Sequence, residues 1–448
     1  MLSPLKVKQG FVQACFGVLM IGSTLAQPSL DLHACVDYTL THHESNRVYQ
    51  NQAAISQQQA KEALAGYLPQ INGVAALDDN LKRQTTIIPA GVFGSEDIRV
   101  QFGNQYSTTA TVQLDQTIYD QSLIYGLRAN VPNMEIARLK KEKNDEELII
   151  QTAKAFYQVL ATRQKLALLA ENEQKFQEQL EVVKLQYEKG VAKKIDYDRM
   201  RVSLNNVRSQ KQVLQTNEEL ALNRLRLAMG LPQEAELNLA EISLLDMDIE
   251  VPVSGEFDPQ HNIDLQLQSQ SIALQEIDLK RKSASRLPTV SAYGRYGAQA
   301  LGNELGASYN NWFDFSSIGL KVNVPIFGGL RRYSQITQSS LNLENAKINY
   351  KLAAENLDMQ LQNVSTILNS ARINVANNRE NLALAKDVFD NSTLQYEKGV
   401  APFSDFVNAD FAYKEAQNNY INSVLDYLTA RLDYERASGS LSEYIQQL

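Results

Sequence analysis

The sequence predicts a mixed α and β fold built from two similar halves, each with a long helical hairpin and a pair of strands. Three observations support this prediction. The string LQYEKGVA occurs twice, at 185–192 and at 394–401. Two stretches of about 70 residues contain almost no helix breakers, and four shorter stretches alternate apolar with polar residues. Self-similarity of this kind indicates a duplicated structural unit, an internal two-fold repeat.

The repeated string predicts two tight turns between helices. Gly190 and Gly399 each end a helix-favouring stretch, and glycine permits the left-handed backbone that such a turn needs. A simple turn explains the glycines, but it does not explain why Val-Ala follows both of them. An aspartate also stands six positions after each glycine, as Asp196 and Asp405. The two turns are therefore candidates for a functional site.

Two very long helices are expected to lead into these turns. The stretch 120–189 carries only Gly126 and Pro132, both in its first turns, and the stretch 330–398 carries neither residue type. A helix of about 70 residues is roughly 105 Å long. Because that length exceeds a globular domain, each helix must pack along its length on other helices. The returning helices are expected at 192–228 and 402–437.

Four stretches alternate apolar and polar residues as strands do: 70–77, 106–118, 289–299 and 317–326. Leu-Pro precedes the first strand of each half, at 68–69 and 287–288, where proline ends a helix and begins a strand. Polar loops, 78–105 and 300–311, separate the strands. Each half is thus expected to run helix, strand, loop, strand, long helix, turn, helix.

The ends of these segments suggest four parts of the chain. Residues 1–26 have the charge and apolar run of a secretory signal peptide, with cleavage expected after Ala26. A first repeat then spans 27–230, a linker spans 231–261, and a second repeat spans 262–448. Removal of the signal would leave Cys35 as a single cysteine, unable to form an intrachain disulfide. We favour a buried thiol there over a lipoprotein cleavage box.

The strands offer a route across a membrane, since no later stretch of the sequence is apolar enough for a helical span. Strands with one apolar face can cross a bilayer only in a closed barrel, and four strands cannot close one without other copies of the chain. Aromatic residues gather at the strand ends and are candidate interfacial girdles, although soluble sheets carry such aromatics too: Tyr309, Trp312, Phe313 and Phe315 at one end, and Tyr119, Tyr125 and Phe327 at the other.

Taken together, the doubled turn motif, the Leu-Pro strand entries, the PIFGG string at 325–329 and the duplication resemble the TolC-like outer membrane efflux family, over nearly all of the chain after the signal. This family comprises the outer membrane factors of tripartite pumps. The resemblance implies a homotrimer in the outer membrane of a Gram-negative bacterium. Each protomer would give four strands to a 12-stranded transmembrane β-barrel in outer membrane lipid, and its long hairpins would form a periplasmic α-barrel.

The resemblance also implies roles for residues at the two turns. The family's turns contact a periplasmic adaptor, or membrane fusion protein, and through it an inner-membrane pump. The matching positions are Gly190, Val191 and Ala192 in the first turn, and Gly399, Val400 and Ala401 in the second.

The family closes its duct with a gate beside these turns. Asp405 matches the gate aspartate, Asp196 matches the polar residue that faces it, and Tyr396 matches a gate tyrosine. Asn408 stands where some members carry a second aspartate, and Ala401 where they carry an arginine, so a less acidic gate is expected. Three copies of Asp405 around an axis would favour cations. Helix capping by Asp196 and Asp405 is an alternative and compatible interpretation.

The function expected from this resemblance is a passive exit duct of an efflux pump or type I secretion system, gated at the turns and without a cofactor. The alternative is a periplasmic coiled-coil scaffold or adaptor without a pore. An enzyme is not indicated: there is no Walker A string or dinucleotide fingerprint. The four histidines, His33, His42, His43 and His261, lack the spacing of a metal site. The net charge of −8 argues against nucleic acid as a partner.

Overall fold

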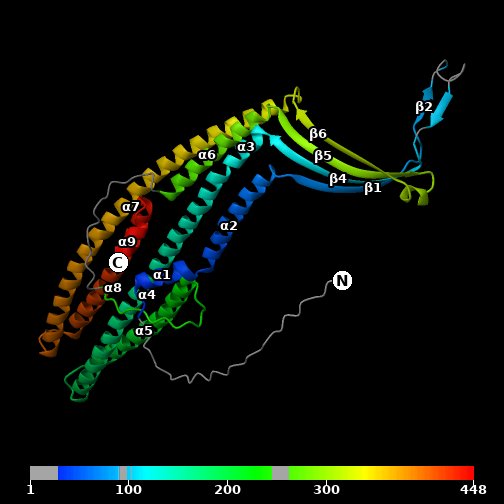
Figure 1. The fold of residues 1–448 in the computed structure, drawn as a ribbon. Coiled ribbons are helices and arrows are strands. Elements are labelled where there is room, and N and C mark those ends of the chain that lie inside the picture. Colours follow the sequence, from blue (N-terminus) through cyan, green and yellow to red (C-terminus); the bar gives the residue numbers. More distant parts are fainter. Residues whose placement is uncertain (1–28, 89, 91–97, 102, 245–261, 448) are drawn as a thin grey trace, which may run out of the picture.

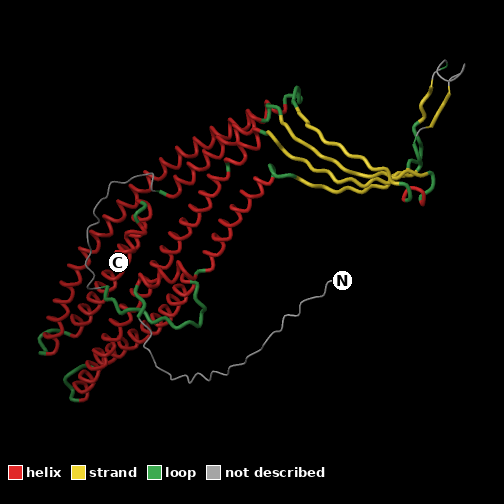
Figure 2. The backbone as a smooth tube through the Cα atoms, viewed as in Figure 1, coloured by secondary structure: helices red, strands yellow, loops and turns green. Residues whose placement is uncertain are grey.

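The protein is an elongated bundle of helices with a curved sheet extending from one end (Figure 1). This computed structural model describes residues 29–88, 90, 98–101, 103–244 and 262–447. The expected signal peptide and much of the expected linker lie outside the described residues. The two hairpin turns lie together at the end of the bundle that is remote from the sheet (Figure 2).

The helices of the first half are α1 (Leu32–His42), α2 (Glu44–Ala65), α3 (Gln121–Arg128), α4 (Asn130–Glu188) and α5 (Lys194–Met229). The sequence predicted one unbroken helix from 120, but the structure interrupts it at Ala129, between α3 and α4. Pro132 explains the break, because its ring lacks an N–H and removes the helical hydrogen bond to the carbonyl of Arg128.

The second half contains α6 (Ile263–Ala284), α7 (Arg331–Glu397), α8 (Phe403–Ser438) and the short α9 (Leu441–Gln447). The long breaker-free helix is confirmed, since α7 is continuous over 67 residues. The two return helices, α5 and α8, each run for 36 residues, close to the expected bounds. The terminal helix α9 was not predicted.

The predicted strands are confirmed as one antiparallel sheet in the order β1 (Gln70–Asp79), β4 (Tyr106–Tyr119), β5 (Thr289–Gly302) and β6 (Trp312–Asn323). The first loop contains an unpredicted hairpin, β2 (Thr85–Ile88) with β3 (Ile98–Gln101). It projects beyond the far end of the sheet (Figure 1). Strands β1 and β6 are the outer strands, so each leaves one row of backbone groups unpaired within this sheet.

One face of the sheet is apolar and exposed, as the alternation predicted. The pairing aligns Leu114 on β4 with Gly294 on β5 and Ile318 on β6, which places these positions on one face. The side chain of Ile318 is 90% exposed and that of Leu320 is 70% exposed. Such apolar exposure in strands indicates a surface that something else covers.

The aromatic girdle predicted at the start of β6 was partly wrong. Phe313 pairs with Gln299 and Phe315 with Gly297, so both lie on the polar face of the sheet, opposite Trp312. The girdle was inferred from proximity in sequence, whereas successive strand residues point to opposite faces. Trp312 itself keeps its place on the apolar face, where its indole N–H donates to the carbonyl of Tyr309 at 3.0 Å.

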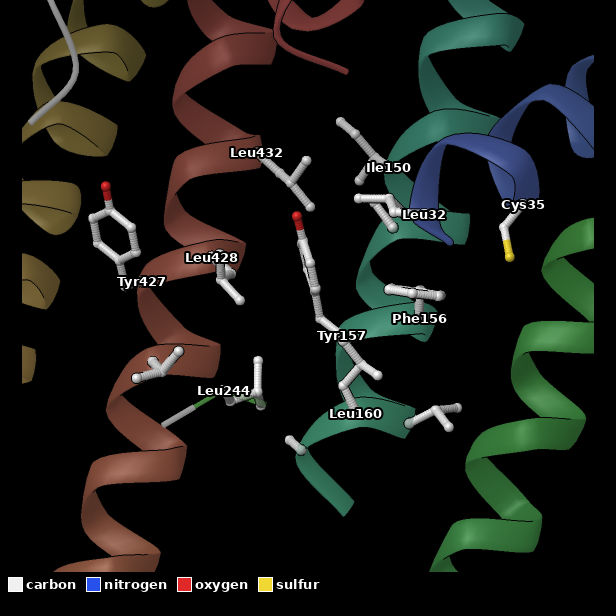
Figure 3. Close-up of a cluster of buried hydrophobic side chains, with 14 of the residues drawn as sticks. Leu32, Cys35, Ile150, Phe156, Tyr157, Leu160, Leu244, Tyr427, Leu428 and Leu432 are labelled. Carbon is white, nitrogen blue, oxygen red and sulfur yellow. The ribbon is translucent and has the colours of Figure 1, made fainter. Parts of the chain in front are cut away.

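The main core lies where the two halves meet, between α4, α8, α1 and α5 (Figure 3). Phe156 and Tyr157 of α4 are buried together with Leu432 of α8. Cys35 of α1 is fully buried, and burial, with a smaller effect from Asp31, raises the pKa of its thiol to about 12. The expectation of a buried thiol is therefore confirmed.

A polar cavity lies where α4 meets the start of α6, α7 and the end of α8. Burial raises the pKa of Glu146 to about 7, against the opposing effect of the nearby Arg436 and Lys143. The cavity lining includes Lys143, Glu146, Asp264, Asn356, Gln360 and Arg436. Since the folded state favours the neutral form of this carboxyl, its contribution to stability is complete below about pH 4.5 and is lost as the pH rises through about 7.

We predict that Glu146→Gln flattens the pH dependence of stability between pH 5 and 8. The wild-type protein should lose thermal stability across this range, because Glu146 must ionise in a partly desolvated site, and the glutamine cannot ionise. The measurement is the unfolding midpoint in detergent at several pH values.

The neighbouring Glu147→Gln is the control. A hydrogen bond from Gln151, with Arg436 nearby, lowers the pKa of Glu147, so that carboxyl stays ionised across the range. Equal slopes in wild type and Glu146→Gln would contradict the role assigned to Glu146.

Candidate functional site at the hairpin tips

The two turns, here called the hairpin tips (189–193 and 398–402), share one backbone geometry. Gly190 has φ 76° and Gly399 has φ 71°, both in the left-handed region. At the first tip the N–H of Gly190 donates to the carbonyl of Tyr187 at 2.9 Å, and that of Val191 to Gln186 at 2.8 Å. The second tip repeats both bonds, at 2.9 Å each. This pattern is a Schellman motif, which explains the need for glycine.

The residue after each glycine projects outward at the apex. Val191 is 78% exposed and Val400 is 77% exposed. Ala192 and Ala401 are half-buried beneath them. Each tip therefore presents one apolar side chain that the protomer itself does not cover, which suits a contact with another protein.

Asp196 and Asp405 lie in the first turns of α5 and α8. Lys193 and Pro402 occupy the N-cap positions, and neither helix has a side-chain cap hydrogen bond. The capping interpretation is thus not supported as a hydrogen bond, although each carboxylate still lies at the positive end of its helix. Asp196 is half-buried, while Asp405 is exposed and accepts a hydrogen bond from the Ser404 hydroxyl at 3.3 Å.

Tyr396 of α7 packs against α8, the other helix of its own hairpin. Its ring centroid lies 5.4 Å from that of Phe403 and 5.7 Å from that of Phe406. Burial raises the pKa of Tyr396, and the charge of Asp196 on the other hairpin raises it further. Asp196 therefore lies near enough to act on Tyr396 through its charge.

Asp405 and Asn408 take a different position. Both are exposed on α8, whereas their neighbours Phe406 and Ala409 are buried. Among the described residues, neither makes a hydrogen bond or ion pair to the first hairpin. Their shared face remains available to whatever lies outside the protomer.

An apolar cluster beneath the tips holds the hairpins together. The rings of Phe176 on α4 and Phe406 on α8 lie 6.4 Å apart between centroids, which joins the first hairpin to the second. Phe389 of α7 stacks on Tyr413 at 5.4 Å. The buried members are Phe176, Val183, Met200, Leu204, Val207, Phe389, Phe403, Phe406 and Ala409.

Sequence reasoning missed a buried ion pair beside this cluster. The Lys414 ammonium lies 2.7 Å from an Asp410 carboxylate oxygen and 4.0 Å from the ring centroid of Phe176. Burial raises the pKa of Asp410 and lowers that of Lys414, while their mutual attraction opposes both shifts. The four-residue spacing of acid and base was the available signal. Asp410 faces inward, so it does not replace the aspartate absent at Asn408.

Residues 46–231 and 260–440 match the outer membrane efflux protein family. The chain belongs to this family. It is a TolC-like outer membrane protein of Gram-negative bacteria with a long periplasmic helical part. Within the described residues, no helix is long and apolar enough to span a membrane, and no cluster of metal-binding side chains is found.

Relatives and solved structures agree with this membership. The chain is 22% identical over 348 residues to the alkaline protease secretion protein AprF of Pseudomonas aeruginosa, covering 75% of this chain and 70% of AprF. It is 24% identical to the outer membrane efflux protein BepC of Brucella suis, covering 83% and 81%. The fold matches the crystal structure of VceC from Vibrio cholerae with a TM-score of 0.72 at 15% identity, covering 91% and 96%.

We predict that Lys414→Met destabilises the protein by about 3 kcal/mol, because it leaves the buried Asp410 carboxylate without its partner. The measurement is chemical unfolding in detergent. Asp410→Asn combined with Lys414→Met should recover most of the loss, since no buried charge then remains.

Lys386→Met is the matched control, because it breaks an exposed pair with Asp390 of the same four-residue spacing. It should have little measurable effect. Equal losses from Lys386→Met and Lys414→Met would refute the importance of burial at Asp410.

Proposed function

We propose that this protein is a passive exit duct, a homotrimer that carries solutes across the periplasm and the outer membrane and is gated at its hairpin tips. The observation that carries the proposal is the four-stranded sheet, whose exposed apolar face and two outer strands remain unsatisfied in one protomer. Lipid covers the apolar face, and strands of neighbouring copies form backbone hydrogen bonds with the two outer strands.

Closure by three copies follows from the strand order. Strand β1 of one protomer pairs with β6 of the next, so that three copies contribute twelve strands and leave no edge. The apolar positions, such as Leu114 and Ile318, then face lipid, and the polar positions of the same strands face the lumen. A pore-free periplasmic scaffold gives no use to this exposed apolar face.

The gate lies at the tips. Asp405 and Asn408 lie on the exposed face of α8 and line the narrow end of the trimeric duct, where a ring of Asp405 carboxylates favours cations. Tyr396 and Asp196 hold the two hairpins of one protomer in the closed arrangement. Opening moves α5 and α8 apart and releases this contact.

The tips also form the docking surface for a periplasmic adaptor, which connects the duct to an inner-membrane pump. Val191 and Val400 supply exposed apolar side chains at the apex. The names of the relatives support an assembly of this kind, since AprF is a secretion protein and BepC an efflux protein.

We predict that Asp196→Ala with Asp405→Ala increases single-channel conductance or open probability in planar bilayers and weakens cation selectivity. The first substitution removes a negative charge near Tyr396. The second removes the ring of Asp405 carboxylates at the constriction. The wild-type protein should show small, cation-selective steps.

Asp198→Ala is the control, since Asp198 lies two residues after Asp196 and 4.0 Å from Arg201 of the same helix. It should leave conductance unchanged. A double variant indistinguishable from wild type would remove Asp196 and Asp405 from the gate. Absence of any conductance from folded protein would instead favour the scaffold.

A further inference from the structure

The polar face of the sheet carries two cations that the proposed gate and tips do not use. Arg295 lies on β5, opposite Gln113 of β4 and Ser317 of β6. Lys321 lies on the same face of β6. It is about 13 Å along the strand from Ser317, on the side toward the helices. Among the described residues, neither Arg295 nor Lys321 makes an ion pair.

Two aromatic rings beside Arg295 are held flat against the sheet by glycines. A Cβ placed on Gly297 would lie 2.7 Å from Cζ of Phe315, and one on Gly319 would lie 2.8 Å from the hydroxyl oxygen of Tyr293. Each ring therefore occupies space that only glycine leaves open. The Arg295 guanidinium carbon lies 5.3 Å from the ring centroid of Phe315, a cation–π contact that fixes the position of the charge.

Two cations and one acid, Asp115, lie on this part of the polar face. Asp115, the nearest acid on this face by register, accepts both hydrogen bonds of the Gln113 amide, at 3.0 and 2.9 Å. The Ser317 hydroxyl oxygen is buried and has no hydrogen-bond partner. A hollow on the sheet, here called the cationic hollow, is lined by the polar-face residues Gln113, Tyr293, Arg295, Ser317 and Lys321.

We propose that the cationic hollow is a binding station for organic anions that carry an aromatic or apolar body. The Arg295 guanidinium supplies hydrogen-bond donors for a carboxylate or sulfonate, and Lys321 adds a second positive charge. The rings of Tyr293 and Phe315 offer flat apolar surfaces beside these donors.

This inference rests on the proposed duct, because only a closed barrel turns the polar face toward the lumen. Three copies then place three Arg295 and three Lys321 side chains around one axis. The duct would have sections of opposite sign, acidic at the tips and cationic within the barrel. Solutes with an anionic group and an apolar body would concentrate in the barrel section.

The test is block of single-channel current in planar bilayers by 2-naphthalenesulfonate, an anion with an aromatic body. The wild-type channel should be blocked, and Arg295→Gln with Lys321→Gln should raise the half-blocking concentration about tenfold, because charge-assisted hydrogen bonds are lost. The cation 2-naphthalenemethylammonium has the same body and should show no such dependence on Arg295 and Lys321.

Two further variants keep the result interpretable. Arg47→Gln removes an exposed arginine of α2 that pairs with Glu44, and it should leave the block unchanged. Arg295→Lys keeps the charge and should keep most of the block. If lysine loses the block as fully as glutamine, the role of Arg295 is packing on Phe315 and the station is refuted.

Failure of the station and failure of the duct give different results. A conducting wild-type channel with the same half-blocking concentration as the double glutamine variant overturns the station and leaves the duct intact. Folded protein that never conducts overturns the duct itself. Equal dependence of the cationic probe on Arg295 and Lys321 would also overturn an anion-specific site.

Discussion

The architecture depends on how the unpaired edges of one four-stranded sheet are satisfied. Backbone N–H and C=O groups in a bilayer must all be hydrogen-bonded, because no water is available to them. Strands β1 and β6 each leave a row of such groups open within the sheet, and the apolar face beside them is exposed. A single protomer meets neither requirement, which is why we propose that other copies of the chain close the sheet.

A second constraint, the need of long helices for partners along their length, shapes the helical part of the protein. Helices as long as α4 and α7 are stable only where they pack along their length, and the main core between α4 and α8 provides this in the middle of the molecule. Below it, Phe176 of the first hairpin contacts Phe406 and Lys414 of the second. The tips are thus anchored to one another beneath an exposed apex, which suits a gate that moves as hairpins and not as loose ends.

Much of this arrangement could be predicted from the sequence because its signals are local. The glycines of the tips, the breaker-free run of α7 and the alternation in β4 and β6 each depend on near neighbours along the chain. The break at Ala129 was also local, but the effect of Pro132 was underestimated. The β2–β3 hairpin lies in a loop whose polar composition hid its two short strands.

The features that sequence reasoning missed arise from contacts between distant segments. The ring of Phe315 fits against the sheet because Gly297 of the neighbouring strand leaves room for it, which the local sequence of β6 does not reveal. The partner of Asp410, Lys414, likewise packs on Phe176, which belongs to the other hairpin. Close packing and burial depend on contacts between distant segments, whereas helix and strand formation depends mainly on neighbours in the chain.

The most direct test of the account is disulfide cross-linking between the outer strands of different copies. Variants would carry one cysteine in β1, at Asn72 or Gly73, and one in β6, at Ser316, Ser317 or Ile318, with Cys35 replaced by serine. We expect oxidation in membranes to yield covalent dimers and trimers when the two cysteines point to the same face of the sheet. Pairs in which one cysteine is shifted by one residue, and so points to the opposite face, should not cross-link. Only monomers from every pair, in protein that is folded and in the outer membrane, would contradict closure of the sheet by other copies of this chain.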